Sequence, residues 1–186
     1  MAAVRLFEER GFDGTTVEDI ADAADVSVST FFRLFPRKED VIFYDLPERL
    51  DAMRADFAAA DHPTAWQTVR TTFVSNARTW DDEEQSFGLA RARLFHTERA
   101  LHARYLEMCQ EWEDVVAGLV AAERGTDPRA DLYARLVGTT TVSAFRAAFI
   151  ARISGGGNEI AGLLDEAFAM LEQGVANSPP ARKRKR

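Results

Sequence analysis

Apolar positions recur at helical spacing along most of the chain, and no segment shows the strict alternation of a half-buried strand. Turn-forming residues divide this pattern at residues 11–14, 36, 62–63, 125–128 and 155–157. Between them the pattern predicts helices over residues 2–10, 15–24, 27–35, 37–59, 64–80, 85–95, 98–123, 128–153 and 158–174. Pro47 removes a backbone donor, so a kink or restart is expected near residues 45–46. The sequence therefore predicts an all-α fold.

Residues 15–38 are the most informative stretch, because they predict two short helices joined by a tight turn. Thr15 or Thr16 can cap the first helix, and Ser27 can cap the second. Asp25 tolerates the left-handed backbone conformation better than most residues and is expected in the turn. Val26 is expected to fill the angle between the two helices.

The second of these helices is expected to turn Phe31 and Leu34 into the core and the rest of its side chains outward. The outward residues are Ser, Thr, Val, Phe and Arg, and several of these types can contact base edges or phosphates. A short exposed helix behind an amphipathic partner is the helix-turn-helix arrangement, whose second helix enters the major groove. A helical hairpin that merely packs has the same spacing, so the pattern alone leaves both interpretations open.

The segment over residues 6–21, continued at 26–27 and 30–40, resembles the DNA-binding head of TetR-type transcriptional regulators. The resemblance covers about the first 45 residues. It implies a homodimer with a three-helix head, a double-stranded DNA operator as partner, and a C-terminal domain that senses a small molecule. By position, the family's DNA contacts fall on Thr16, Ser27, Val28, Ser29, Thr30, Phe32, Arg33 and Lys38.

The chain departs from this family pattern at three places. Phe32 stands where the family usually has Tyr, so the contact of that hydroxyl with a phosphate is expected to be lost. Asp25 replaces the usual Gly of the turn, which adds backbone strain and a negative charge near the DNA. Met1 falls inside the family's first helix, so one or two helical turns and a basic arm of the family have no counterpart here.

Net charge bears directly on the expected DNA contact. The chain carries 23 Lys and Arg against 30 Asp and Glu, a formal net charge of −7. Even residues 1–46 contain five basic and ten acidic side chains. Arg33, Arg37 and Lys38 are expected to gather at the DNA face, and a local basic patch is sufficient for counterion release. Few phosphate contacts, and weak binding at physiological salt, are therefore expected.

Residues 47–176 carry most of the aromatic side chains and are expected to form a ligand-binding and dimerisation domain after a head at residues 1–46. The aromatic set permits an apolar pocket between helices, although an ordinary helical core has the same composition. Arg146 either pairs with an acidic group of a ligand or lies at the rim. The candidate ligand-binding residues are Phe73, Phe87, Arg91, Phe95, His96, Tyr105, Trp112 and Arg146.

The last two predicted helices combine small residues with a broad apolar stripe, which favours a two-fold, four-helix dimer interface. Both faces could instead pack internally. Motifs between residues 80 and 167 are similar to the TetR-type C-terminal domain of the actinobacterial mycofactocin-regulator type, which implies a hydrophobic or acyl-type effector. Residues 177–186 are expected to form a disordered basic tail.

Several classes of function lack their sequence signals. Cys109 is the only cysteine, and His62, His96 and His102 are scattered, so no metal site or other cofactor is expected. Charged residues at positions 8–10 interrupt any signal peptide, and no run of about 18 apolar residues predicts a membrane span. Without a signal peptide or a membrane span, we expect a cytoplasmic protein. The sequence offers no constellation of catalytic residues, so we expect a protein that is not an enzyme.

These observations predict a ligand-responsive DNA-binding transcriptional regulator, a repressor rather than an activator, that binds a pseudo-palindromic operator as a dimer. The predicted helix over residues 38–59 would transmit the ligand signal to the head. The alternative is a helical ligand-binding or protein-interaction dimer whose head has lost specific DNA binding.

Overall fold

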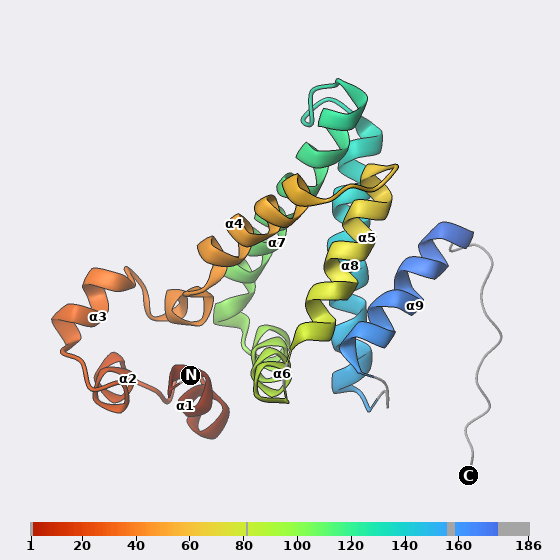
Figure 1. Cartoon of the computed structure of the whole chain (residues 1–186). Coiled ribbons are helices and arrows are strands. Elements are labelled where there is room, and N and C mark those ends of the chain that lie inside the picture. Colours follow the sequence, from red (N-terminus) through yellow and green to blue (C-terminus); the bar gives the residue numbers. More distant parts are fainter. Residues whose placement is uncertain (1, 81, 156–158, 175–186) are drawn as a thin grey trace, which may run out of the picture.

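The structure is a computed structural model that describes residues 2–80, 82–155 and 159–174. The expected basic tail, residues 177–186, lies outside the described residues. Over the described ranges the chain is all-α and forms no strand (Figure 1). In chain order its elements are α1 (Ala2–Arg10), α2 (Val17–Ala23), α3 (Val28–Leu34), the 3-10 helix η1 (Lys38–Phe43), α4 (Leu46–Ala59), α5 (Ala65–Thr79), α6 (Asp82–Thr97), α7 (Arg99–Arg124), α8 (Leu132–Ile153) and α9 (Ile160–Gln173).

Helices α1 to α3 form the head, and local capping sets their boundaries. Gly11 ends α1 with a φ of +76°, a conformation that costs glycine little. Thr16 caps α2 in a capping box with Asp19, in which each residue's side chain accepts from the other's backbone N–H. Asp25 takes the left-handed conformation expected of it, with φ +53°, and Ser27 caps α3. The helix-turn-helix geometry is therefore confirmed.

Two predicted core residues of the head lie at its surface instead. Leu34 is 59% exposed and Val26 is also exposed, so both expectations were wrong. The inner position at the end of α3 belongs to Phe35, whose ring packs on that of Phe31 with centroids 5.3 Å apart. Phe35 lies four residues after Phe31, whereas Leu34 is the last residue of a helix of seven and points away.

The link between head and body is α4, which runs obliquely from the head along the body (Figure 1). The restart expected near residues 45–46 is confirmed, because η1 ends at Phe43 and α4 begins at Leu46 with Pro47 in its first turn. Proline is tolerated there because the first turn of a helix has no internal acceptor for its backbone donors.

The body consists of α5 to α9, with the long helices α7 and α8 packed side by side. Gly138 allows this close approach, because a Cβ atom at that position would lie 2.5 Å from the carbonyl oxygen of Glu113 on α7. Helix α8 begins at Leu132 rather than at residue 128, since Asp131 accepts from the backbone N–H groups of Tyr133 and Ala134 and caps it. Residues 127–130 form a turn before it.

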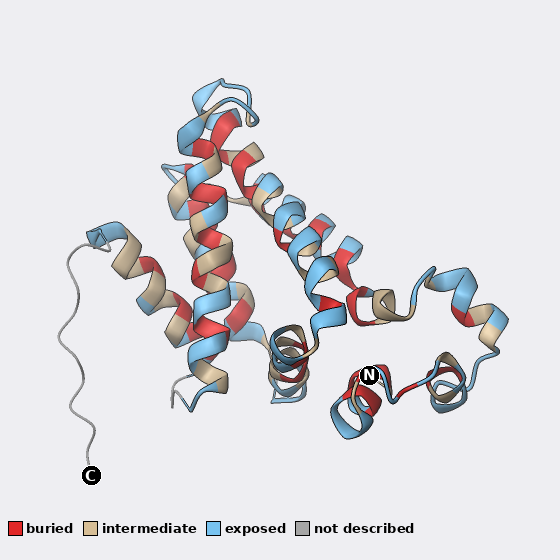
Figure 2. Ribbon diagram, turned by 180° about the vertical axis from the view of Figure 1, so that it is seen from behind, coloured by how far each residue is buried: buried red, intermediate tan, exposed pale blue. Residues whose placement is uncertain are grey.

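Buried side chains form two clusters (Figure 2). The body core lies among α4, α5, α7, α8 and α9. The second cluster, here called the head-joint core, joins the head to the link and to α6 and α7. It includes Phe7, Phe12, Ile20, Phe31, Ile42, Phe43, Leu46, Leu50, Ala90, Leu94 and Leu101.

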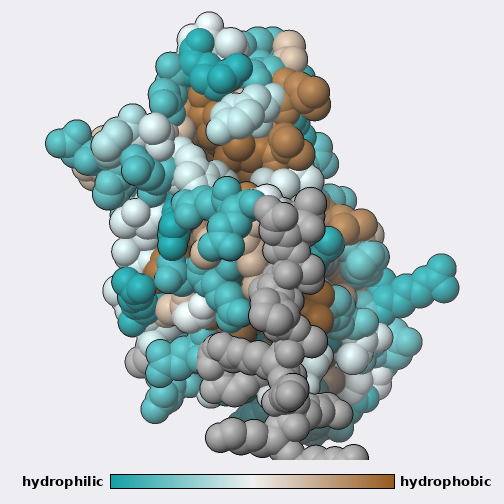
Figure 3. Space-filling model, turned by 90° about the vertical axis from the view of Figure 1, so that its right-hand side faces the viewer, coloured by the Kyte–Doolittle hydropathy of each residue, from teal (hydrophilic) through white to brown (hydrophobic). Residues whose placement is uncertain are grey.

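One side of α8 carries exposed apolar side chains. Leu132 is 81% exposed and Leu136 is 56% exposed, and Tyr133 and Ile150 are also exposed. Hydrophobic surface is visible on the side of the molecule that carries α9 (Figure 3). By length and composition alone α8 could cross a membrane, which is weak evidence because the core helix of a helical bundle passes the same test. Its other side packs against α7 and α9, as in a bundle helix.

Candidate DNA-reading helix and effector pocket

The outward face of α3 has the character expected of a DNA-reading helix. Ser29, Phe32 and Arg33 are exposed, and Val28 and Thr30 are half-buried. The ring of Phe32 meets Phe31 edge-on, with centroids 5.6 Å apart, so it is held outward by the head core. Among the described residues, no hydrogen bond or ion pair holds the Arg33 guanidinium, which is therefore available to a base or a phosphate.

The hydroxyl groups expected at the DNA face already have local partners. Thr16 Oγ1 lies 2.7 Å from Asp19 Oδ2, within the capping box. Ser27 Oγ accepts from the backbone N–H of Thr30 at 3.1 Å and donates to the Thr30 hydroxyl at 3.0 Å. These side chains fix the N-termini of α2 and α3. Their exposed lone pairs still leave them able to accept, so the predicted DNA contacts stay predictions.

The expected basic cluster is only partly available at this face. Lys38 Nζ donates to the carbonyl oxygens of Phe12 at 2.7 Å and Thr15 at 2.9 Å, and it lies 4.0 Å from the centroid of the Phe12 ring. The ammonium group of Lys38 therefore binds backbone carbonyl groups within the head, whereas a contact with a DNA phosphate had been expected. Arg37 pairs with Asp40, whose hydrogen bond raises the pKa of the guanidinium. Of the three expected cations, only Arg33 is unengaged.

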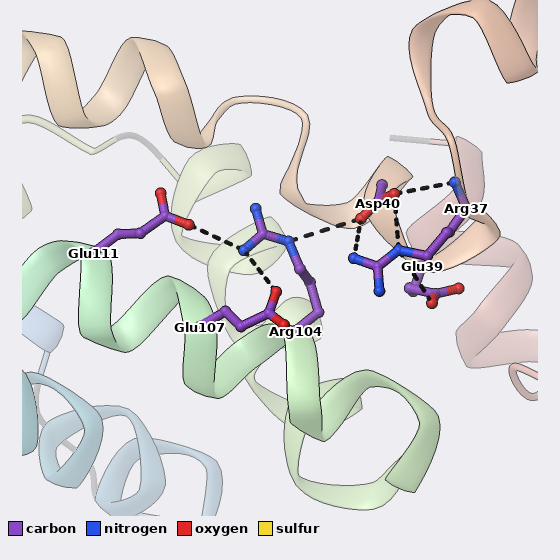
Figure 4. A network of polar contacts seen from close by, with 6 residues as sticks. All are labelled: Arg37, Glu39, Asp40, Arg104, Glu107 and Glu111. Carbon is purple, nitrogen blue, oxygen red and sulfur yellow. Dashed lines mark hydrogen bonds and ion pairs between the residues drawn. The ribbon is translucent and has the colours of Figure 1, made fainter.

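A polar network ties η1 to α7 (Figure 4). Asp40 lies between two guanidinium groups, 3.1 Å from Arg37 Nη2 and 3.7 Å from Arg104 Nε. Arg104 also pairs with Glu107 and Glu111 on its own helix, and its guanidinium lies over the Phe43 ring at 5.2 Å. The joint between head and body is therefore held by charge as well as by apolar packing.

The body contains a cavity of about 480 Å³, within the size range of small-molecule sites. Helices α4, α5, α6, α7 and α8 all contribute to its walls. Most of the lining is apolar, and it is rich in aromatic rings: Phe73, Trp80, Phe95, Tyr105, Trp112, Phe145 and Phe149. Asp45 before α4 and Leu46 and Arg49 within it also line the cavity, so a ligand there would touch the start of the link to the head.

Seven of the eight ligand-binding candidates line this cavity: Phe73, Arg91, Phe95, His96, Tyr105, Trp112 and Arg146. Phe87 does not line the cavity. Its neighbour on α6, Gly88, lies on the cavity wall instead, and the Phe87 side chain packs against the head-joint core. His96 and Arg146 are exposed, which places them at the mouth rather than the interior. The sequence missed Asp45, Arg49, Met53, Met108 and Cys109 as lining residues.

A triad of charges, Asp45, Arg49 and Arg91, lines the cavity, with Asp45 and Arg91 buried and Arg49 exposed. Arg91 Nη1 donates to both carboxylate oxygens of Asp45, at 3.0 and 2.9 Å, and Arg49 Nε donates to Oδ2 at 2.6 Å. Burial lowers the pKa of Arg91, and the carboxylate of Asp45 opposes this effect. Burial also pushes the pKa of Asp45 upward, but the two guanidinium groups outweigh it and hold that pKa below its usual value.

Tyr105 connects the cavity to the joint. Its ring stacks on Phe95 at 4.8 Å, and Phe95 stacks on Phe43 of η1 at 5.0 Å. Burial raises the pKa of Tyr105, and an interaction with the Cys109 thiol raises it further. Within the described ranges, no group of three or more His, Cys, Asp or Glu side chains is arranged to hold a metal ion.

Two family models match the chain. The one described as "Bacterial regulatory proteins, tetR family" matches residues 1–44, and the one described as "MftR C-terminal domain" matches residues 63–176. Among characterised relatives, the HTH-type transcriptional regulator TcmR of Streptomyces glaucescens is 30% identical over 141 residues, or 73% of this chain. A protein assigned as the mycofactocin biosynthesis transcriptional regulator MftR of Mycobacterium tuberculosis is 26% identical over 123 residues, or 66% of this chain. The matched region spans 62% of the length of each relative.

Among solved structures, Thermus thermophilus FadR, a TetR-family transcriptional repressor in complex with lauroyl-CoA, has the same fold with a TM-score of 0.64 and 25% identity. That match covers 97% of this chain and 95% of the other. The helix-turn-helix head, the helical body and the two matching family models agree with one another. The chain belongs to the TetR family of bacterial transcriptional regulators.

Proposed function

We propose that the chain is a cytoplasmic transcriptional repressor that releases its operator when an effector enters the body cavity. The observation that carries this proposal is the position of Asp45, Leu46 and Arg49, which line the cavity and also begin the helix that leads to the head. A ligand that changes the packing of these residues would tilt α4 and move α3. Residues 1–46 would then act as the DNA-binding head, and residues 47–176 as the sensing and dimerisation domain.

A homodimer is part of the proposal. Leu132, Leu136 and Ile150 expose apolar surface along one side of α8, more than a lone bundle helix needs to leave uncovered. A two-fold axis beside α8 and α9 would cover this surface and place two heads side by side. Two such heads would enter successive major grooves of a pseudo-palindromic operator, about 34–36 Å apart.

The proposed effector is hydrophobic or acyl-type. The aromatic lining of the cavity supports this class, because burial of a hydrocarbon ligand between rings is favourable. The related Thermus thermophilus repressor is in complex with lauroyl-CoA, an acyl ligand, which supports the same class. No catalytic role is part of this proposal.

The test is fluorescence anisotropy on labelled DNA from upstream of the protein's own gene, with scrambled DNA as competitor. We expect Arg33→Ala to weaken specific binding by about 5- to 150-fold, since a base contact of an arginine contributes about 1–3 kcal/mol. Arg129→Ala is the matched control. It removes the same charge from an exposed position in the turn between α7 and α8, at the end of the molecule away from the head (Figure 1).

The same experiment separates the main alternative, a ligand-binding dimer whose head no longer reads DNA. That alternative draws on the internal pairing of Arg37 and Lys38, which leaves few cations free for phosphates. Equal affinity for own and scrambled DNA, unchanged by Arg33→Ala, would favour it and contradict the regulator. The dimer is checked separately by sedimentation of the wild type and of both variants.

A further inference from the structure

One buried donor in the cavity has no partner. Arg91 is 7% exposed, and its Nη1 atom makes both hydrogen bonds to Asp45, while its Nε–H is buried and donates to no acceptor among the described residues. Buried polar groups in folded proteins almost always have a partner, so an unpartnered donor beside a cavity is a candidate contact for an acceptor on a ligand. Arg91 lines this cavity directly.

Charge at the same place favours an anionic acceptor over a neutral one. The triad holds two guanidinium groups and a single carboxylate, a net charge of +1, with Arg91 and Asp45 buried and Arg49 exposed. Charges interact more strongly at the buried Arg91 than they do in water. The other carboxylates of the lining are Asp56, which accepts from Asn76, and Glu84, which is exposed.

We propose that the inner end of the cavity binds the carboxylate of an amphipathic organic acid, with its hydrocarbon part among the aromatic rings. This inference rests on the proposed function of the cavity as the effector site and names the chemical class of the effector. A guanidinium presents its donors in a planar fork that matches a carboxylate. The carboxylate of the acid would accept a hydrogen bond from the unpartnered Nε of Arg91. It would also compete with Asp45 for the hydrogen bonds of the other guanidinium nitrogens.

The orientation follows from burial. Arg146 also lines the cavity, but it is exposed at the mouth, where water screens its charge. Arg91 lies inside, 5.4 Å from the centroid of the Phe87 ring and 6.0 Å from that of Phe95. The acid therefore enters with its carboxylate first. Because Asp45 immediately precedes α4, competition for Arg91 acts directly on the link to the head.

The probes are decanoate and 1-decanol, which share a hydrocarbon chain and differ in the charged group. Binding is followed by quenching of tryptophan fluorescence, since Trp80 and Trp112 line the cavity. We expect the wild type to bind decanoate at least tenfold more tightly than decanol. Arg91→Gln is expected to abolish this preference while leaving the affinity for decanol within about twofold. Arg146→Gln, the matched control, is expected to keep the preference.

Asp45→Asn provides an independent test of the proposed carboxylate site. It removes the competing charge, so the affinity for decanoate is expected to rise severalfold, with no change for decanol. Near-ultraviolet circular dichroism checks that each variant is folded, and Arg91→Lys, which keeps the charge, replaces Arg91→Gln if the latter does not fold. The lysine variant is expected to lose most of the preference, because an ammonium group lacks the planar fork.

Equal affinity of the wild type for the two probes, or no binding of either, would overturn the inference. So would a preference that survives Arg91→Gln but disappears in Arg146→Gln, because the carboxylate would then lie at the mouth. These outcomes are independent of DNA. Operator binding without a preference for the acid would leave the proposed repressor standing, whereas a preference without operator binding would leave only the acid site.

Discussion

The close contact between α7 and α8 can be tested at Gly138. A Cβ atom there would lie 2.5 Å from the carbonyl oxygen of Glu113 and 3.4 Å from the Cβ of Ala117. The nearest atom belongs to the backbone of a helix, so no side chain can rotate to relieve the clash. Gly138→Ala must therefore push the two longest helices of the body apart.

The expected cost follows from two opposing effects. Overpacking in a core costs about 1–3 kcal/mol, whereas alanine gains about 1 kcal/mol over glycine from its helix propensity. We expect Gly138→Ala to lower the free energy of unfolding by about 1–2 kcal/mol, because the clash involves backbone on both sides. For a chain of this size, each kcal/mol shifts the melting temperature by roughly 2–4 °C.

Gly118 on α7 supplies the matched control, because a Cβ atom there would meet nothing within 4 Å. Gly118→Ala keeps the gain in helix propensity without a clash and is expected to stabilise the protein by up to about 1 kcal/mol. Urea denaturation followed by circular dichroism, at one protein concentration for all variants, compares the two. If Gly138→Ala proves as stable as Gly118→Ala, Gly138 is not a contact point and the reasoning fails.

Three further variants test the head and the triad. Thr16→Ala removes the capping box of α2 and is expected to cost about 1 kcal/mol in urea denaturation, while Thr64→Ala, the cap of α5, serves as its counterpart in the body. Lys38→Met is expected to cost about 1.5–3 kcal/mol, because two carbonyl groups lose a charged donor; a variant as stable as the wild type would return Lys38 to the DNA face. The pKa of Asp45 is lowered in the folded state, so its stabilising effect is present above its unfolded pKa of about 3.9 and is lost as pH falls through the folded value. The stability difference between wild type and Asp45→Asn should therefore shrink between pH 6 and pH 3, and a constant difference would contradict the linkage.

Sequence reasoning succeeded where the deciding interaction is local. The cap at Ser27 depends on a donor three residues away, so side-chain type and position were sufficient to place it, and the same local reasoning narrowed the cap of α2 to Thr15 or Thr16. The left-handed turn at Asp25 and the restart of α4 after Asp45 are local for the same reason. These features are enough to predict the all-α class and two short helices joined by a tight turn, whereas the helix-turn-helix interpretation needed the family resemblance as well.

Sequence reasoning failed where a partner lies far along the chain. Asp45 and Arg91 are 46 residues apart, and no spacing or periodicity links them. Lys38 reaches back to carbonyl groups of Phe12 and Thr15, an interaction that a positional comparison with a family cannot anticipate. Phe87 was assigned to the cavity because it is aromatic, but on α6 it is Gly88 that lies on the cavity wall.

The head-joint core limits how a protein of this kind can change during evolution. Ile42, Phe43 and Leu46 lie in one apolar cluster with Leu94 and Leu101, so the apolar interior of the head is completed by α6 and α7 of the body. A gene fusion that joined this head at residue 46 to an unrelated body would expose the part of that interior that Leu50, Ala90, Leu94 and Leu101 cover. New combinations of operator and effector would then arise by gradual substitution within the whole chain. The head and the body would be duplicated and inherited together.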